Sequence, residues 1–414
     1  MQFSGQLSAL RHRQFLKYWL GSFTSVGATQ LQVMGLGWLV WELSSSSLML
    51  GYLGAAAGVP AAVLTIFGGA LADRLNKRFV LMVTSLLTAA LLGLLTYLDY
   101  TDLVQVWQVI MITGAISIVT GFDWPVRQSI FPSLIERSDM MSAVALTTVI
   151  WQATRMVMPA LGGIIIAVAD TWLLFAFCSA GFFTMFLVLL TIKIHSVVVK
   201  TQHSTLSQIK EGLRFILHSP EFLILITLSY AICFFATSYM QLMPAFADML
   251  SANEQEFGYM LSIGGIGAVV GTIFSSSLQN SRRLGTVILY SAIVYCGFIF
   301  LFAAICLTDW HSAYLVALAM IFLSGIFNSI FMITSTGVLQ LEVPDGLRGR
   351  VMGLHAITYN MLPLGALFTG AIASFSNPSF ALVVSTCIVL SYLLWIALKR
   401  PDIRGIDGTI LGQG

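Results

Sequence analysis

One arginine lies where a charge is costly unless it has a partner or a ligand. Arg155 is near the middle of a long apolar run, residues 141–168, that is long enough to cross a membrane. A charge at that depth costs roughly 3 kcal/mol on insertion scales, so it must face a polar cavity or a partner. Gln152 precedes it and Pro159 follows it at helical spacing, so the three share one side of a helix. Two interpretations follow: Arg155 binds an anionic or carbonyl-rich substrate, or it hydrogen-bonds backbone carbonyls that Pro159 leaves free.

Other polar residues inside otherwise apolar runs extend the set of candidate substrate contacts. Each is either a ligand for a substrate or one half of a hydrogen bond between helices. The full candidate set is Arg155, Gln30, Gln152, Tyr230, Thr237, Gln241, Asn328, Tyr359 and Asn360.

A second group of charged residues stands where apolar runs end. The loop after the second run packs one acid, Asp73, among three bases, and Asp123 and Arg127 lie together where the fourth run ends. Partly buried charges are paired when they can be. We therefore predict an ionic network, against the alternative of a basic loop whose side chains are merely solvated. The predicted members are Asp73, Arg74, Arg78, Asp123 and Arg127.

Candidate proton carriers are sparse. No Asp or Glu lies at the middle of an apolar run, although intramembrane acids are common proton relays. Glu42 is at the outer end of the first run and Asp123 at the inner end of the fourth. His355 is the remaining candidate, because a histidine changes its charge near neutral pH.

The composition explains why these residues must sit on membrane helices. Of the 414 residues, 57% are hydrophobic and 9% charged, whereas a soluble domain carries about 25% charged residues. Most of the surface must therefore face lipid, and the predicted fold is an all-α integral membrane protein. A spanning helix needs roughly 20 apolar residues. The candidate spans are residues 18–41, 48–71, 79–98, 103–124, 141–168, 172–192, 221–246, 257–278, 284–306, 311–336, 351–375 and 379–398.

The charges test this count of twelve helices. If the amino terminus is inside, every Lys and Arg except Arg155 falls on the inner side. The outer segments carry acids instead. Because Lys and Arg are retained on the cytoplasmic side of short loops, we predict twelve spans with both termini cytoplasmic. The outer acids are Glu42, Asp99, Asp102, Asp170, Asp248, Glu254, Glu256 and Asp309.

An internal repeat divides the chain into halves. A shift of 208 residues brings Arg74 onto Arg282 and Gly162 onto Gly370. Parallel repeats of this kind are typical of transporters. The predicted units are a six-helix bundle over residues 1–192, a cytoplasmic linker over 193–220, a second bundle over 221–400 and a tail over 401–414. Within the linker, residues 206–216 have the apolar spacing of an amphipathic helix.

The loop after the second span resembles a motif of the major facilitator superfamily. Gly69, Leu71, Ala72, Asp73, Arg74, Lys77 and Arg78 match it, with Asn76 in place of the usual glycine. Further segments resemble the bacterial branch of enterobactin exporters and macrolide efflux proteins: residues 122–128, 159–163 and 347–352. Residues 158–163 are similar to the antiporter motif of the fifth helix, with Met158 at a usual glycine. The resemblance implies alternating access around a midplane cavity and proton-coupled export. It also implies an inner gate, formed by Gly69 of the loop together with the predicted network of Asp73, Arg74, Arg78, Asp123 and Arg127.

Other classes of function find little support. The five cysteines lie inside apolar runs and lack metal-ligand spacing, and no zinc pair or Ser/His/Asp arrangement appears. We expect no enzyme activity, cofactor or metal. The net charge of +2 and the scattered bases do not indicate nucleic-acid binding. A receptor is disfavoured because the linker holds no soluble domain.

The sequence and the resemblance thus predict a monomeric, proton-coupled secondary transporter of the bacterial inner membrane that exports a small amphipathic molecule, such as an anionic siderophore or a drug. Its expected partners are the substrate, the lipid bilayer and protons. An importer of an anionic nutrient or siderophore with the same fold is the alternative.

Overall fold

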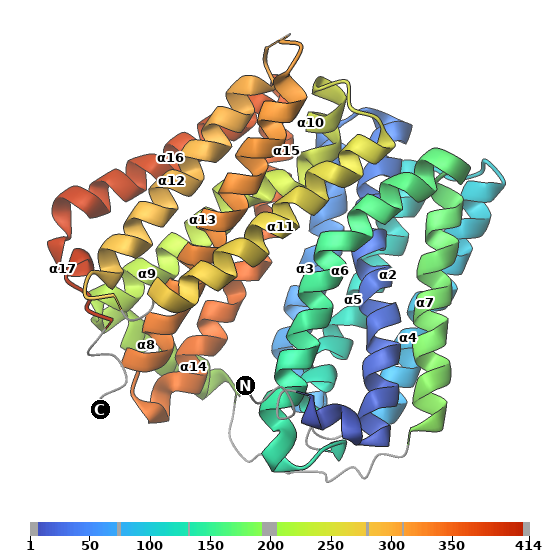
Figure 1. The fold of residues 1–414 in the computed structure, drawn as a ribbon, viewed down its shortest axis with the longest axis horizontal. Helices are drawn as coiled ribbons and strands as arrows, with labels where there is room; N and C mark the ends of the chain where they lie inside the picture. Colours follow the sequence, from blue (N-terminus) through green and yellow to red (C-terminus); the bar gives the residue numbers. More distant parts are fainter. Residues whose placement is uncertain are drawn as a thin grey trace. The chain divides into compact units, whose positions relative to one another are not determined.

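The computed structural model describes residues 7–72, 76–130, 133–192, 205–278, 281–308 and 310–408, and the described chain is helical with no strand (Figure 1). In lipid every backbone polar group must be bonded internally, and helices achieve this within a single segment. The prediction of an all-α membrane protein is confirmed.

The helices form two compact units, and each unit takes a short segment from the other half of the sequence. Unit 1 contains residues Met1–Ser45, Ala55–Thr201 and Glu254–Ser262, and unit 2 contains Ser46–Gly54, Gln202–Asn253 and Ile263–Gly414. The two borrowed segments, Ser46–Gly54 and Glu254–Ser262, are each the beginning of a long helix.

Unit 1 is built on the long helices of the first half of the chain. Its elements are η1 (Ser8–Arg11), α2 (Arg13–Ser44), most of α3 (Ser47–Ala72), α4 (Lys77–Tyr100), α5 (Val106–Ser129), η3 (Arg137–Asp139), α6 (Met140–Ala169) and α7 (Thr171–Thr191). Helix α2 packs along α6 and α7, and α4 packs between α5 and α7. Phe15, Leu81, Val126 and Leu146 meet in a buried cluster that joins α2, α4, α5 and α6. This cluster fixes the positions of the polar side chains beside it.

Unit 2 is likewise built on long helices, and two of them are interrupted. Its elements are α8 (Thr205–His218), α9 (Pro220–Ala231), η4 (Ile232–Ala236), η5 (Thr237–Leu242), α10 (Met243–Met249), most of α11 (Glu254–Leu278), α12 (Leu284–Ile305), α13 (Ala313–Glu342), α14 (Asp345–Ala356), η6 (Ile357–Asn360), α15 (Met361–Phe375), α16 (Pro378–Lys399) and α17 (Pro401–Arg404).

The interruptions correct the expectation of continuous helices over residues 221–246 and 351–375. The first span changes from α-helix to π-helix at Ile232 and to a 3-10 helix at Thr237, and the second is 3-10 over Ile357–Asn360. A Cβ on Gly365 would lie only 1.8 Å from the carbonyl oxygen of Phe234. Helix α15 therefore approaches the irregular segment at backbone distance. Irregular turns inside long helices are frequent at functional sites.

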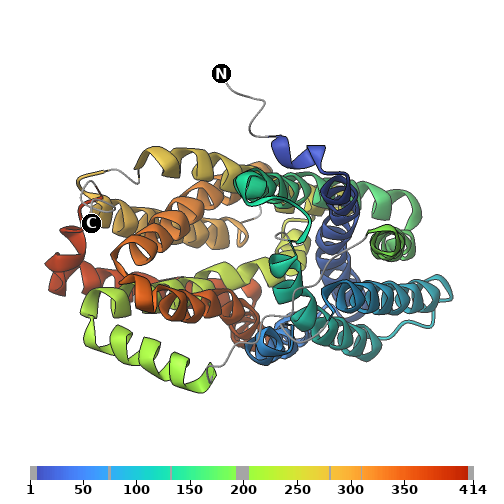
Figure 2. The same ribbon diagram turned by 90° about the horizontal axis from the view of Figure 1, so that it is seen from below.

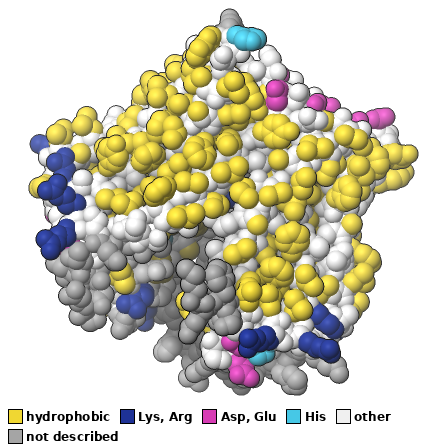
Figure 3. Space-filling model, in the orientation of Figure 1, with side chains coloured by type: hydrophobic (Ala, Val, Ile, Leu, Met, Phe, Trp, Pro, Cys, Tyr) yellow, Lys and Arg dark blue, Asp and Glu magenta, His cyan; other side chains and the backbone are white. Residues whose placement is uncertain are grey.

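Eleven helical segments of the described chain are long and apolar enough to cross a membrane. Helix α2, with 32 residues, is a further long helix, and its glutamines keep it less apolar than the eleven. On the face shown in Figure 3, hydrophobic side chains form a broad band, and most charged side chains lie at its margins. The chain is therefore a multi-pass membrane protein.

Candidate functional site

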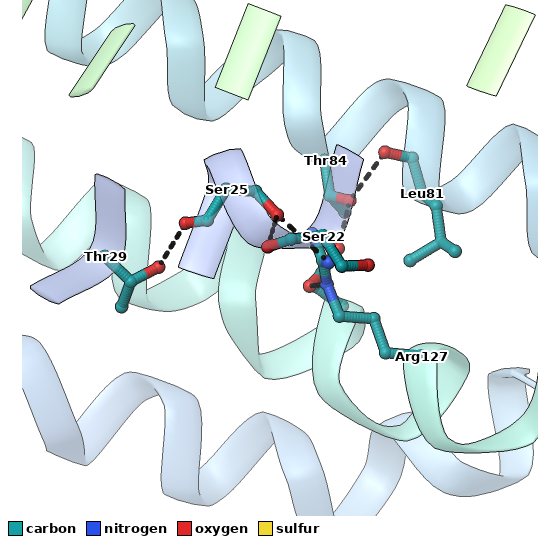
Figure 4. A network of polar contacts seen from close by, with 7 residues as sticks. Ser22, Ser25, Thr29, Leu81, Thr84 and Arg127 are labelled. Carbon is teal, nitrogen blue, oxygen red and sulfur yellow. Dashed lines mark hydrogen bonds and ion pairs between the residues drawn. The ribbon is translucent and has the colours of Figure 1, made fainter. Parts of the chain in front are cut away.

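A buried ion pair joins three helices inside unit 1. Arg127 Nε donates to Asp123 Oδ2 one turn earlier on α5, and Thr84 of α4 donates to Asp123 Oδ1 at 2.7 Å. Arg127 Nη1 lies 3.3 Å from the hydroxyl of Ser25 on α2 (Figure 4). The two charged side chains are only 13% and 14% exposed. A pair this buried holds only with its hydrogen bonds complete, because isolated charges in a low dielectric are costly.

The predicted inner-gate residues fall into three groups. Asp123 and Arg127 are brought together, as just described. Asp73 and Arg74 lie outside the described residues, and Gly69 lies in α3 where side-chain surroundings are not described. Arg78 is bonded elsewhere.

Arg78 closes the end of α7. Its Nε donates to the carbonyl of Leu189 at 2.8 Å, and its Nη2 donates to that of Leu190 at 2.7 Å. The last carbonyls of a helix lack partners within the helix, and a cation there also complements the helix dipole. Arg78 thus links the start of α4 to the end of α7.

The polar stripe of α6 is open on one side. Arg155 and Gln152 are both partly exposed, and neither has a hydrogen bond or ion pair with any described residue. Gln30 on the neighbouring α2 is likewise partly exposed and without a described partner. Helix α2 lies against α6 at this level, since a Cβ on Gly27 would lie 3.3 Å from the side chain of Met158. Three side chains with unused donors therefore occur on two adjacent helices.

The candidates in unit 2 divide into core and accessible positions. Thr237 is buried and bonds Tyr295 at 3.0 Å between hydroxyls. Tyr230 donates to the carbonyl of Leu354 at 2.5 Å, which ties α9 to α14. These bonds already satisfy both side chains. By contrast Tyr359 is 68% exposed in the middle of a membrane span, and Asn360 beside it is partly exposed.

Two further candidates in unit 2 have buried atoms that lack a described partner. The Oδ1 atom of Asn328 on α13 is buried and has no described hydrogen-bond partner. The same is true of the Nδ1 atom of His355 on α14. The other ring nitrogen of His355 lies 3.1 Å from the hydroxyl of Thr336. Buried polar atoms are normally bonded, so each exception requires an explanation such as a ligand or a water molecule.

Gln241 belongs to a different feature, a close helix crossing. In unit 2 the first turns of α3 lie against α15: a Cβ on Gly370 would be 2.6 Å from the carbonyl oxygen of Ser47, and one on Gly51 would be 3.1 Å from Cα of Leu367. Gln241 lies beside this crossing, because its Cγ would be 3.6 Å from a Cβ on Gly54. Only glycine permits such an approach of one backbone to another.

The same crossing recurs in unit 1 between α6 and the first turns of α11. A Cβ on Gly163 would lie 2.5 Å from the carbonyl oxygen of Glu254, and one on Gly258 would lie 2.5 Å from that of Pro159. Gly51 and Gly258 are 207 positions apart, as are Gly163 and Gly370, so the structure corrects the predicted shift of 208, which paired Gly370 with Gly162. One added bond distinguishes this crossing: the amide of Ala160 donates to Ser262 Oγ at 2.9 Å.

A cavity of about 400 Å³ adjoins the crossing in unit 1. Its lining includes Glu42, Asp170, Glu254 and Trp38. The cavity places Glu42 with the other acids that the sequence assigns to the outer side. Glu42 is exposed and has no described ion pair.

Sequence reasoning missed several residues that build these features. Thr84 and Ser25 complete the ion pair, and their only signal was polarity within apolar runs. Gly258 and Ser262 were overlooked, because the predicted shift of 208 places Gly51 opposite Tyr259 rather than Gly258. The pairing of these helices depends on long-range packing, which sequence spacing does not reveal.

The described chain forms two compact helical units, and each contains polar side chains within membrane spans. This architecture is typical of transporters of the major facilitator type. A profile of the family described as transmembrane secretion effectors matches residues 4–408, so the chain belongs to this family of the major facilitator superfamily.

Known relatives support the same assignment. The chain is 26% identical over 365 residues to a staphyloferrin A transporter of Staphylococcus aureus, with 85% of each chain covered. It is 24% identical over 420 residues to the enterobactin exporter EntS of Escherichia coli, covering 97% of this chain and 98% of the relative.

Solved structures share the fold at lower identity. The nucleoside transporter NupG matches with a TM-score of 0.74 and 13% identity, over 93% of this chain and 98% of that one. A bacterial homologue of ferroportin in an inward-facing state matches with a TM-score of 0.71 and 17% identity, over 92% and 98%.

The crossing in unit 1 predicts a specific disulfide. The test variant carries Ala160→Cys and Ser262→Cys in a Cys387→Ser background, because the other four cysteines are buried. Mild oxidation should cross-link the two new cysteines. The cross-link should stop transport until the disulfide is reduced. Adding Gly258→Val should abolish the cross-link, because the new side chain meets the carbonyl of Pro159. Gly297→Val is the matched control, since a Cβ there has nothing within 4 Å. Undiminished cross-linking with Gly258→Val would contradict the crossing.

The ion pair predicts how the stability of a double variant compares with that of a single variant. Asp123→Asn should destabilise the protein by about 3 kcal/mol, because Arg127 would remain as an unpaired buried charge. The double variant Asp123→Asn, Arg127→Gln should be more stable than this single variant. Thermal unfolding of the purified protein, followed by tryptophan fluorescence, measures both. Equal stability of the single and double variants would show that the pair is solvated.

Proposed function

We propose that the protein is a proton-coupled secondary exporter that moves a small amphipathic, anionic molecule by alternating access. It acts as a monomer in the inner membrane of a bacterium, with both termini in the cytoplasm. The observation that supports this proposal most directly is Arg155, a partly exposed cation in the middle of a span that has no described partner. The alternative role for Arg155, binding the carbonyls freed by Pro159, has no such hydrogen bond to support it among the described residues.

Each unit contributes its own set of proposed substrate contacts. Arg155, Gln152 and Gln30 supply donors from unit 1. Tyr359 lies 207 positions after Gln152, so the repeat assigns it the matching place in unit 2. Its side chain is exposed, which supports a place on the substrate-accessible surface. Asn360 and the unbonded amide oxygen of Asn328 extend the set.

Two of the earlier candidates take a supporting role in this proposal. Tyr230 and Thr237 have their hydroxyls bonded within unit 2, so they hold the interrupted helix in place. Gln241 is assigned to the crossing of α3 with α15.

The two crossings themselves serve as the outer gate, because opening the outer side requires each borrowed segment to leave its glycine contact.

An anionic substrate follows from the charge of the surface. A guanidinium presents up to five donors and pairs carboxylates in a bidentate geometry. The printed names of the relatives, staphyloferrin A transporter and enterobactin exporter, support a substrate of the siderophore class, and a drug of similar chemistry is compatible.

Proton coupling is assigned to His355, with Asp123 and Glu42 as further candidates. His355 is a buried imidazole with one nitrogen bonded to Thr336 and the other unbonded among described groups. Asp123 is a candidate because its ion pair with Arg127 lies at the junction of α2, α4 and α5. Glu42 at the outer cavity is placed to exchange protons with the outside.

The substrate role of Arg155 predicts a loss of affinity with retained folding. Arg155→Gln should weaken binding of an anionic siderophore about 10-fold to 100-fold, the equivalent of losing one charge-assisted hydrogen bond. Equilibrium binding to purified protein tests this. Thr154→Val is the matched control, because the hydroxyl of Thr154 bonds only within its own helix. Unchanged affinity in Arg155→Gln would remove the substrate role.

Direction and coupling are tested together in sealed liposomes of known orientation. An imposed pH gradient should drive the substrate against the proton movement, and His355→Gln should remove the proton flux. Substrate and proton moving in the same direction would instead favour an importer of an anionic nutrient or siderophore. Substrate movement without proton flux would leave the transporter intact and overturn the coupling.

A further inference from the structure

The helix that precedes the first span of unit 2 has one face that the protein does not cover. Helix α8 (Thr205–His218) runs along the outer edge of unit 2, where Figure 2 shows it beyond the spanning helices. It lies outside the segments that cross the membrane. None of the transport chemistry described above uses it.

One side of α8 is docked on α14. A Cβ on Gly212 would lie 3.0 Å from Cβ of Arg350 and 3.3 Å from its carbonyl oxygen, so the two helices meet at backbone distance. Arg350 Nη1 also donates to Glu211 Oε1 at 2.6 Å. Ile216, one turn after Gly212, is buried on the same side. Helix α8 is therefore attached to the first segment of the interrupted helix α14–η6–α15.

The opposite side presents leucines next to bases. Leu213 and Leu217 are 45% and 57% exposed, and one turn separates them. Arg214 and His218 follow them around the helix and are exposed as well. The only described hydrogen bond among the four side chains joins His218 to the carbonyl of Arg214, at 2.7 Å. Arg214 has no acidic partner among the described residues, while the one acid nearby, Glu211, is held by Arg350.

We infer that this face of α8 binds the headgroups of anionic phospholipids at the cytoplasmic surface of the bilayer. An amphipathic helix in the interface buries its apolar edge among the upper acyl chains and turns its bases toward phosphate. Leu213 and Leu217 form that edge, and Arg214 lies beside them to pair a phosphate. Neutralisation of Glu211 by Arg350 leaves the charge of Arg214 uncancelled.

Charge and area favour a lipid over a protein partner. Among the described side chains of α8 the exposed apolar part consists of two leucines, whereas a stable protein interface buries about 800 Å² on each side. A basic strip next to a short apolar edge complements an anionic leaflet, where each base near the surface contributes to binding. Because α8 is attached to α14, lipid that holds α8 also holds the inner end of the interrupted helix.

The experiment uses the full-length protein, one copy per nanodisc, in a Cys387→Ser background. An environment-sensitive fluorophore is attached at Leu217→Cys. In discs that contain 30% phosphatidylglycerol, its emission should shift to the blue and be quenched by lipid labelled near the headgroup. A fluorophore at His218→Cys, which lies further around the helix, should stay water-exposed.

The anionic part is tested by removing the base. Arg214→Gln should lower the amount of phosphatidylglycerol retained, measured by native mass spectrometry, about fivefold. Arg282→Gln is the matched control, because Arg282 is an exposed base of the same unit without a described partner. The variants are compared at equal thermal stability, so loss of folding is recognised separately.

Three results would overturn the inference. The fluorophore at position 217 would emit as in water in both lipid compositions. Alternatively, pure phosphatidylcholine would give the same shift, with no effect of Arg214→Gln on lipid retention. A shift that appears only with two copies per disc would identify α8 as a contact between copies of the chain.

Discussion

The structure depends on four glycines that let helices touch at backbone distance. Gly51 and Gly370 bring the start of α3 against α15, and Gly163 and Gly258 bring the start of α11 against α6. At these points a side chain would overlap a carbonyl or a Cα, so packing is direct between main chains. In lipid, where no hydrophobic force drives helices together, such close contact provides most of the association. The exchange of short segments between the two units follows from these contacts.

The crossings are similar but not identical, and the difference has a physical basis. Pro159 interrupts the hydrogen-bond ladder of α6, and the amide of Ala160 donates to Ser262. The position that precedes Ser262 by 207 residues is Ala55, which has no hydroxyl. The contact of α6 with α11 therefore has a polar bond that the contact of α3 with α15 lacks at the matching place. The two crossings need not separate with equal ease.

The charged side chains lie where the free-energy cost of burying a charge is offset by a partner or avoided by exposure. Asp123 and Arg127 are buried together because each satisfies the other, and Thr84 and Ser25 occupy remaining hydrogen-bonding positions. Arg78 reaches the carbonyl end of α7, where a cation is favoured. Arg155 differs from both, because it is partly exposed and has no such partner among the described residues. A cation left in this state within a span is consistent with a ligand that arrives and departs.

Hydropathy and the distribution of Lys and Arg were enough to predict an all-helical membrane protein, because the bilayer permits few other ways to satisfy a backbone. The loop around Asp73 was enough to indicate the superfamily. Arg155, Asp123 and Arg127 stood out from the sequence because a charge in or beside a span is rare. Whether a polar side chain belongs to the core or to an open surface was decided only by tertiary structure: Thr237 is closed off by Tyr295, whereas Tyr359 is exposed. The helix breaks at Ile232 and Ile357, and the pairing of Gly258 with Pro159, were also decided there. Hydrophobic runs record how long a helix can be, but which helices approach each other depends on the shapes of residues distant in sequence.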